Sequence, residues 1–225
     1  MCLAQPQVCL PRWCPLFDML GLLTRMGSAV CHRMAERSLP WGEGTMPLCA
    51  RCTGIYLGAF VAFAFFFLKR RMAAGKPFSV GQAALTSLMI LPVGIDGVGS
   101  YLGIWESSQL MRVLSGSLVG AVAPGLLLLA VNFQPTEENK QPVYEKTTEL
   151  LLLLAISAGL GVCLWAGLPL VSAFAVLSVA GEVLLWGGFF WLLLKNLFGK
   201  KRLPFWRISL VAAGLVLFVI GGLVQ

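Results

Sequence analysis

Charged residues are scarce in this sequence. Asp, Glu, Lys and Arg make up 12% of the 225 residues, whereas apolar residues make up 58%. Soluble domains contain roughly 25% charged residues. Because the apolar residues form several runs long enough to cross a bilayer, the composition excludes a soluble domain and predicts an all-α integral membrane protein whose partner is the lipid bilayer. We therefore expect a multi-pass protein of the cell membrane.

Features that several other functions require are also missing. The one histidine, His32, adjoins a cysteine and is not available to a nucleophile–histidine–acid triad. The chain has no glycine-rich phosphate loop, and because its Lys and Arg residues lie beside apolar runs, we expect no nucleic-acid partner. Residues 1–15 lack the pattern of a secretory signal and are interrupted by proline, so we expect a poorly ordered extension whose cysteines, Cys2, Cys9 and Cys14, inherit no role.

The pattern of apolar residues predicts the order of the helices. Residues 16–30 place apolar side chains on one stripe and Asp18 and Arg25 on another face, which predicts a short amphipathic helix at the membrane interface. Residues 31–48 are expected to form a polar connection rich in Gly and Pro. Six spans follow, at about residues 49–68, 79–95, 110–133, 148–168, 169–194 and 206–224. We thus expect a membrane domain over residues 16–133 and three further spans over residues 134–225.

The basic residues are divided unevenly between the two ends of the expected spans. One end carries eleven of the 17 Lys and Arg residues, namely Lys69, Arg70, Arg71, Lys76, Lys140, Lys146, Lys195, Lys200, Lys201, Arg202 and Arg207. The other end carries Arg12, Arg25, Arg33, Arg37, Arg51 and Arg112. Because cytoplasmic loops are enriched in Lys and Arg, the first end is expected in the cytoplasm and the second outside it.

Residues with metal-binding side chains gather around the start of the first span. Cys31 and His32 precede it, and Cys49 and Cys52 form a CxxC pair at its beginning. Thiolates and imidazole are ligands that zinc, or another soft transition metal, prefers. We predict a metal site formed by these four residues. Four protein ligands would make the site structural and three would leave a position for water, and the sequence leaves both open.

The expected helix places the CxxC pair at the membrane boundary. Pro47 is favourable in the first turn of a helix, and a helix that begins there directs Cys49 and Cys52 to one side, with Tyr56 a turn further on. From Cys52 to the end of the span the helix would rise about 25 Å, close to the hydrocarbon thickness. At such a helix N-terminus the dipole and the adjacent Arg51 favour thiolate, so the thiols are expected at the outer boundary.

Other interpretations of the CxxC pair are open. The spacing of Cys49 and Cys52 is also that of a membrane thiol–disulfide oxidoreductase. The two residues could equally form a structural disulfide outside the cell, or have no chemistry. The metal content of the purified protein would distinguish the metal site from the thiol–disulfide oxidoreductase.

Two groups of residues resemble the signature of a prokaryotic membrane family catalogued as domain of unknown function twenty eighty-five. The first group comprises Cys31, His32, Glu36, Arg37, Ser38, Gly44, residues 47–56 and Gly58. The second comprises Asp96, Gly97, Glu106, Ser107, Arg112, Gly116 and Gly120. The resemblance covers about residues 20–130 and implies a fold of several spans with no established activity. The last three spans lie beyond the part of the chain that resembles the family.

A supporting polar cluster is expected at the same end as the cysteines. Asp96 ends the second expected span and Arg112 begins the third, and charges at this depth usually pair, so we expect an Asp96–Arg112 ion pair. Alternatively, Asp96 orients the metal site or the pair holds a small anionic ligand. Glu36, Arg37 and Glu106 could join this cluster.

Two features lie within the spans themselves. Gly116 and Gly120 share a face with Arg112, which predicts close packing of the third span against a neighbour. Glu182 lies near the middle of the fifth span, where an ionised carboxylate is costly. We expect a protonated Glu182 that hydrogen-bonds a neighbouring helix, with three serines available, namely Ser157, Ser172 and Ser178. The alternative is a small-solute transporter that uses Glu182 together with the Asp96–Arg112 pair.

Overall fold

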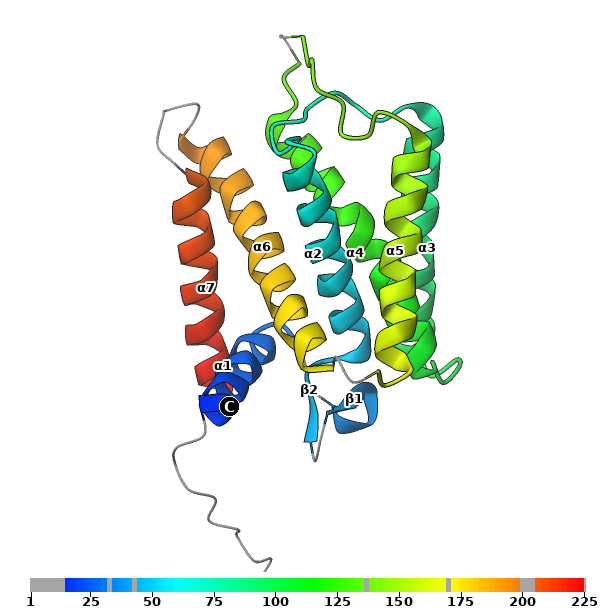
Figure 1. The fold of residues 1–225 in the computed structure, drawn as a ribbon, viewed down its shortest axis with the longest axis vertical. Helices are drawn as coiled ribbons and strands as arrows, with labels where there is room; N and C mark the ends of the chain where they lie inside the picture. The colour runs from blue at the N-terminus through cyan, green and yellow to red at the C-terminus, as the bar shows by residue number, and fades with distance from the viewer. Residues whose placement is uncertain are drawn as a thin grey trace, which may run out of the picture.

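Helices dominate the described part of the chain, with one small β-hairpin (Figure 1). The computed structural model describes residues 15–31, 34–41, 44–135, 138–168, 171–198 and 205–224. The elements are α1 (Pro15–Ser28), a 3-10 turn (Ala35–Arg37), β1 (Ser38–Trp41), β2 (Gly44–Cys49), α2 (Ala50–Leu68), α3 (Val80–Tyr101), α4 (Gln109–Asn132), α5 (Thr147–Trp165), α6 (Val171–Phe198) and α7 (Phe205–Val224). The predicted all-α membrane class is confirmed.

Among the described residues, five helices are long and apolar enough to span a membrane, namely α2, α3, α4, α5 and α6. The described apolar part of α7, Ile208–Leu223, is shorter, and α7 lies along α6 (Figure 1). The chain is therefore a multi-pass membrane protein, and the sixth expected span corresponds to α7. From α2 to α7 successive helices run in opposite directions (Figure 1). The elements before α2 lie at the end of the bundle where α2 begins, and the basic residues after α2 lie at the other end.

Helix α2 lies at the centre of the bundle and has its most extensive contact with α4. Glycines bring the two backbones together. A Cβ atom at Gly120 would lie 2.0 Å from the carbonyl oxygen of Ile55, and one at Gly58 would lie 2.5 Å from that of Ser117. The close packing predicted for Gly116 and Gly120 is confirmed, because only hydrogen atoms fit between these backbones.

The connection before α2 contains a hairpin where we expected a polar loop. Strands β1 and β2 are antiparallel, with Ser38 opposite Cys49. The side chains of Leu39, Met46 and Leu48 are buried in the end of the bundle. The Gly and Pro residues of this segment suggested an irregular chain, but the strands gain their burial from helices that lie far away in the sequence.

Helix α2 begins later than predicted. Pro47 belongs to β2, Cys49 is the N-cap, and Ala50 is the first helical residue. The hydroxyl of Thr53 donates to the carbonyl oxygens of Leu48 and Cys49, at 3.3 and 3.0 Å. Proline suits this strand as well as a first helical turn because in both places its missing N–H can go without a partner.

Helix α3 continues past the expected end of the second span. It runs to Tyr101, so that Asp96 and Gly97 lie inside the helix. Asp96 is only 5% exposed. A charged residue was expected to end the span, but a carboxylate that has an ionic partner can remain within a helix at this depth.

Candidate metal centre

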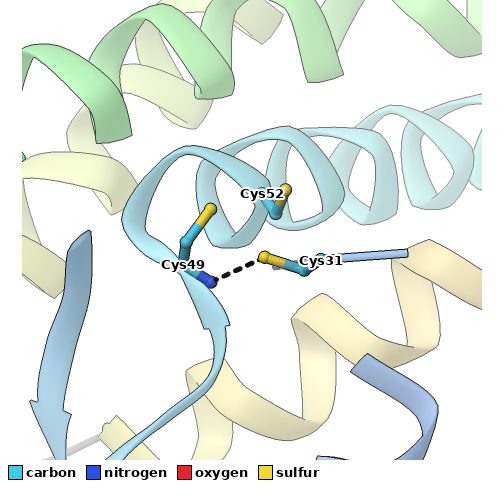
Figure 2. Close-up of side chains that lie close together, drawn as sticks. All are labelled: Cys31, Cys49 and Cys52. Atoms are coloured by element: carbon cyan, nitrogen blue, oxygen red, sulfur yellow. Dashed lines mark hydrogen bonds between the residues drawn. The ribbon is translucent and has the colours of Figure 1, made fainter. Parts of the chain in front are cut away.

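Three thiols converge at one end of the bundle, where β2 turns into α2 (Figure 2). The sulfur atoms of Cys31, Cys49 and Cys52 all lie within 4.8 Å of one another. The backbone N–H of Cys49 donates to the sulfur of Cys31 at 3.3 Å. Cys31 is buried and the other two are partly buried. His32 lies outside the described residues, so the structure places three of the four predicted ligands.

Each thiol comes from a different piece of local structure. Cys31 follows α1, where its N–H donates to the carbonyl oxygen of Gly27 at 3.2 Å. Cys49 ends β2 and caps α2, and Cys52 lies in the first helical turn. A Cβ atom at Gly27 would lie 2.6 Å from the carbonyl oxygen of Pro47. Glycine at this position therefore lets α1 approach β2 closely enough to bring Cys31 to the CxxC pair.

The contacts between the thiols favour a negative charge on Cys49. Hydrogen bonds from the thiols of Cys31 and Cys52 lower the pKa of Cys49, whereas the pKa of Cys31 is raised, chiefly by its hydrogen bond to Cys49. The position of Cys49 at the N-terminus of α2 adds the favourable effect of the helix dipole. The cluster thus favours a soft anionic donor at Cys49, with two more sulfur atoms beside it.

Several charged groups predicted to support the site do lie together. Arg112 lies close enough for electrostatic interaction with four other groups, namely Arg37, Arg51, Asp96 and Cys49. Three guanidinium groups and one carboxylate leave an excess of positive charge around Arg112, which lies close enough to Cys49 to interact with it. That excess would stabilise an anionic thiolate or an anionic metal–thiolate complex.

Asp96 pairs with Arg51, so the predicted pair with Arg112 is wrong. The Nη2 atom of Arg51 contacts the Oδ2 atom of Asp96. Arg112 instead donates to the carbonyl oxygen of Ser107 at 3.2 Å and to the hydroxyl of Ser100 at 3.3 Å. The prediction paired the ends of consecutive spans. In the structure the Arg51 side chain, from the first turn of α2, reaches Asp96 near the end of α3. Arg112 instead forms its hydrogen bonds with Ser100 of α3 and with Ser107 in the loop after α3.

The other members of the predicted cluster lie apart. Glu36 and Glu106 are exposed, on the 3-10 turn and on the loop after α3. Tyr56 is buried one helical turn beyond Cys52, and its hydroxyl accepts a hydrogen bond from Nε1 of Trp186 at 3.3 Å. Trp186 belongs to α6, so no local pattern in the sequence could have identified it as the partner of Tyr56.

Glu182 is completely buried in α6. Among the described residues, neither of its carboxyl oxygens has a hydrogen-bond partner. The three serines predicted as partners do not serve: Ser178 donates to a carbonyl oxygen of its own helix, Ser172 accepts from Trp41, and the hydroxyl of Ser157 has no partner. The predicted hydrogen bond from Glu182 to a neighbouring helix is thus not formed with any of these three serines.

Replacing Glu182 with methionine is expected to stabilise the protein. The substitution removes a buried polar group without a partner and keeps a similar volume, so we expect a gain of about 1–2 kcal/mol and a higher melting temperature in detergent. Leu185→Met, one turn further along α6, is the matched control and should change the melting temperature little. A lower melting temperature for Glu182→Met would show that the carboxyl group makes a stabilising contact.

The fold and the thiol cluster define a multi-pass helical membrane protein with a cysteine site at one end of its bundle. A family model described as predicted membrane protein (DUF2085) matches residues 31–126. A protein of Methanothermobacter thermautotrophicus is 35% identical over 91 residues, which cover 40% of this chain and 78% of that protein. The chain belongs to this family of membrane proteins, and the resemblance seen in the sequence is confirmed.

A second relative, from Methanocaldococcus jannaschii, is 30% identical over 94 residues, which cover 41% of this chain and 58% of that protein. Both relatives are named uncharacterized proteins. No solved structure matches the chain significantly. The matched segment contains the three clustered cysteines, the Arg51–Asp96 pair and the glycines between α2 and α4, whereas α1 and α5 to α7 lie outside it.

Proposed function

We propose that this protein binds a zinc-type metal ion through Cys31, Cys49 and Cys52. The convergence of three sulfur atoms within 4.8 Å is the observation that carries the proposal. In a tetrahedral zinc site with thiolate ligands, sulfur atoms are roughly 3.8 Å apart, as follows from Zn–S distances of about 2.3 Å. Small rotations of the side chains would meet that requirement. His32, next to Cys31 in the sequence, is the candidate for the fourth ligand.

The third sulfur favours metal binding over a dithiol pair. A thiol–disulfide oxidoreductase needs Cys49 and Cys52 only, whereas Cys31 is buried and is oriented toward both. Three soft donors beside arginine side chains suit a thiophilic cation whose complex has a net negative charge. The same site could be structural or catalytic, depending on whether His32 closes it.

We also propose that the thiol cluster faces the outside of the cell. The basic residues directly after α2, namely Lys69, Arg70, Arg71 and Lys76, lie at the opposite end of the bundle, and such residues are enriched on the cytoplasmic side. A membrane-impermeant maleimide should label Cys49 in intact cells after a chelator has removed the metal. Labelling only after the cells are permeabilised would place the cluster inside.

The metal content of the full chain, purified in detergent, tests the site itself. We expect close to one equivalent of zinc per chain, and a loss of most of it in Cys31→Ser, Cys49→Ser and Cys52→Ser, because each variant removes a thiolate ligand. Cys163→Ser is the matched control, since Cys163 is a free cysteine of α5 outside the cluster. His32→Ala should weaken binding if the imidazole is the fourth ligand.

Two results would contradict the proposal. Protein that contains no metal and carries a Cys49–Cys52 disulfide by mass spectrometry would favour the oxidoreductase. Metal retained equally in the three cluster variants and in Cys163→Ser would place the binding site elsewhere in the chain.

A further inference from the structure

An apolar cavity of about 370 Å³ lies toward the end of the bundle opposite the cysteines. Helices α2, α4, α6 and α7 and the connection after α2 line it, with Phe63, Leu128 and Trp191 among the lining residues. Every described residue that lines the cavity is apolar. Water has no polar partner in such a cavity, and lining atoms that face a void lose dispersion contacts. The cavity therefore suits a hydrocarbon ligand.

The rim of the cavity lies where α2 reaches the end of its apolar span. Phe67 lines the cavity and is 73% exposed, and Leu68 next to it is 80% exposed. Lys69 and Arg70 follow directly and are exposed. This order of residues is expected where a helix passes from the hydrocarbon of a bilayer into its headgroups. A hydrocarbon chain that enters the cavity would thus have its polar end beside two cationic side chains.

The charges around the rim are positive. The ammonium group of Lys195 on α6 donates to the carbonyl oxygen of Val131, which lines the cavity. The carboxylates of Glu145 and Glu149 are each 2.7 Å from the guanidinium group of Arg71. Among the described residues, neither Lys69 nor Arg70 forms an ion pair with a carboxylate, although Lys69 lies close enough to Glu149 to act on its charge. Both cations can therefore still attract an anionic group at the rim.

We propose that this cavity binds one hydrocarbon chain of an anionic membrane lipid, with the headgroup at Lys69 and Arg70. The volume falls within the range of about 300–1,000 Å³ that is usual for small-molecule sites. The apolar lining holds the chain, and the cationic rim selects the charge of the headgroup. The site is separate from the thiol cluster and does not depend on the metal.

Trp191 lines the cavity and can report its occupancy through quenching by brominated lipid chains. The full chain is reconstituted in phosphatidylcholine bilayers that contain a small fraction of brominated phosphatidylglycerol or, in parallel, brominated phosphatidylcholine. The part of the fluorescence quenching due to Trp191 is the difference between the wild-type protein and Trp191→Phe. We expect this part to be greater with brominated phosphatidylglycerol than with brominated phosphatidylcholine. Trp165 of α5, which is 48% exposed, is the control: Trp165→Phe should remove equal quenching with the two lipids.

Two further variants separate the chain site from the headgroup site. Lys69→Gln combined with Arg70→Gln should weaken the apparent affinity for phosphatidylglycerol about fivefold for each charge and leave the quenching by phosphatidylcholine unchanged. Ala73→Phe, at the exposed edge of the cavity, should reduce the quenching of Trp191 by both lipids. Equal quenching of Trp191 by both lipids in the wild-type protein, or selective quenching that survives in Trp191→Phe, would overturn the proposal.

Discussion

Adding a single methyl group at Gly120 is expected to cost the protein about 3 kcal/mol of stability, the upper end of the usual cost of overpacking. The new Cβ atom would lie 2.0 Å from the carbonyl oxygen of Ile55 and 3.0 Å from the backbone nitrogen of Ala59. Both are backbone atoms of α2, so no side-chain rotation relieves the clash. Helices α2 and α4 must move apart, which also loosens the contacts of Gly54 and Gly116 in the same interface.

The thermal unfolding of Gly120→Ala in detergent, followed by circular dichroism, measures this cost. Gly159→Ala is the matched control, because a Cβ atom added at Gly159 of α5 would have no atom of a neighbouring element within 4 Å. That variant should be neutral or gain up to about 1 kcal/mol from the higher helix propensity of alanine. Equal melting temperatures for the two variants would refute a rigid backbone contact between α2 and α4.

Replacing Arg51 with glutamine is expected to cost about 2–3 kcal/mol. The change leaves the carboxylate of Asp96, which is buried, without its ionic partner, and an uncompensated buried charge is strongly destabilising. This cost lies at and below the lower end of the range of about 3–5 kcal/mol that is typical of fully buried pairs, because the Arg51 side chain is 25% exposed. The melting temperature and the metal content should both fall, since Arg51 lies between Cys49 and Cys52 in the sequence.

Arg112→Gln is the control for this prediction. Arg112 bonds the loop after α3 and a serine hydroxyl, so Asp96 keeps its partner in that variant and the loss should be smaller. Combining Arg51→Gln with Asp96→Asn should recover part of the stability because the unpaired charge is then removed. A greater loss of stability in Arg112→Gln than in Arg51→Gln would favour the Asp96–Arg112 ion pair predicted from the sequence.

The sequence by itself determined the membrane class, the approximate spans, the position of Cys49 and Cys52 at the start of the first span, and the close packing at Gly116 and Gly120. These properties depend on composition and on spacing within a single helix. An apolar run of a given length spans a bilayer whatever its neighbours are, and residues four apart share a helical face.

The tertiary structure alone decided which distant groups meet. The hairpin gains its burial from α4, α5 and α6, and the approach of α1 to β2 at Gly27 brings Cys31 to the CxxC pair. Arg51 was separated from Asp96 by most of two spans, and their pairing depends on how α2 and α3 both pack against α4. Contacts of this kind arise from the packing of whole helices, whose arrangement no local pattern of residues specifies.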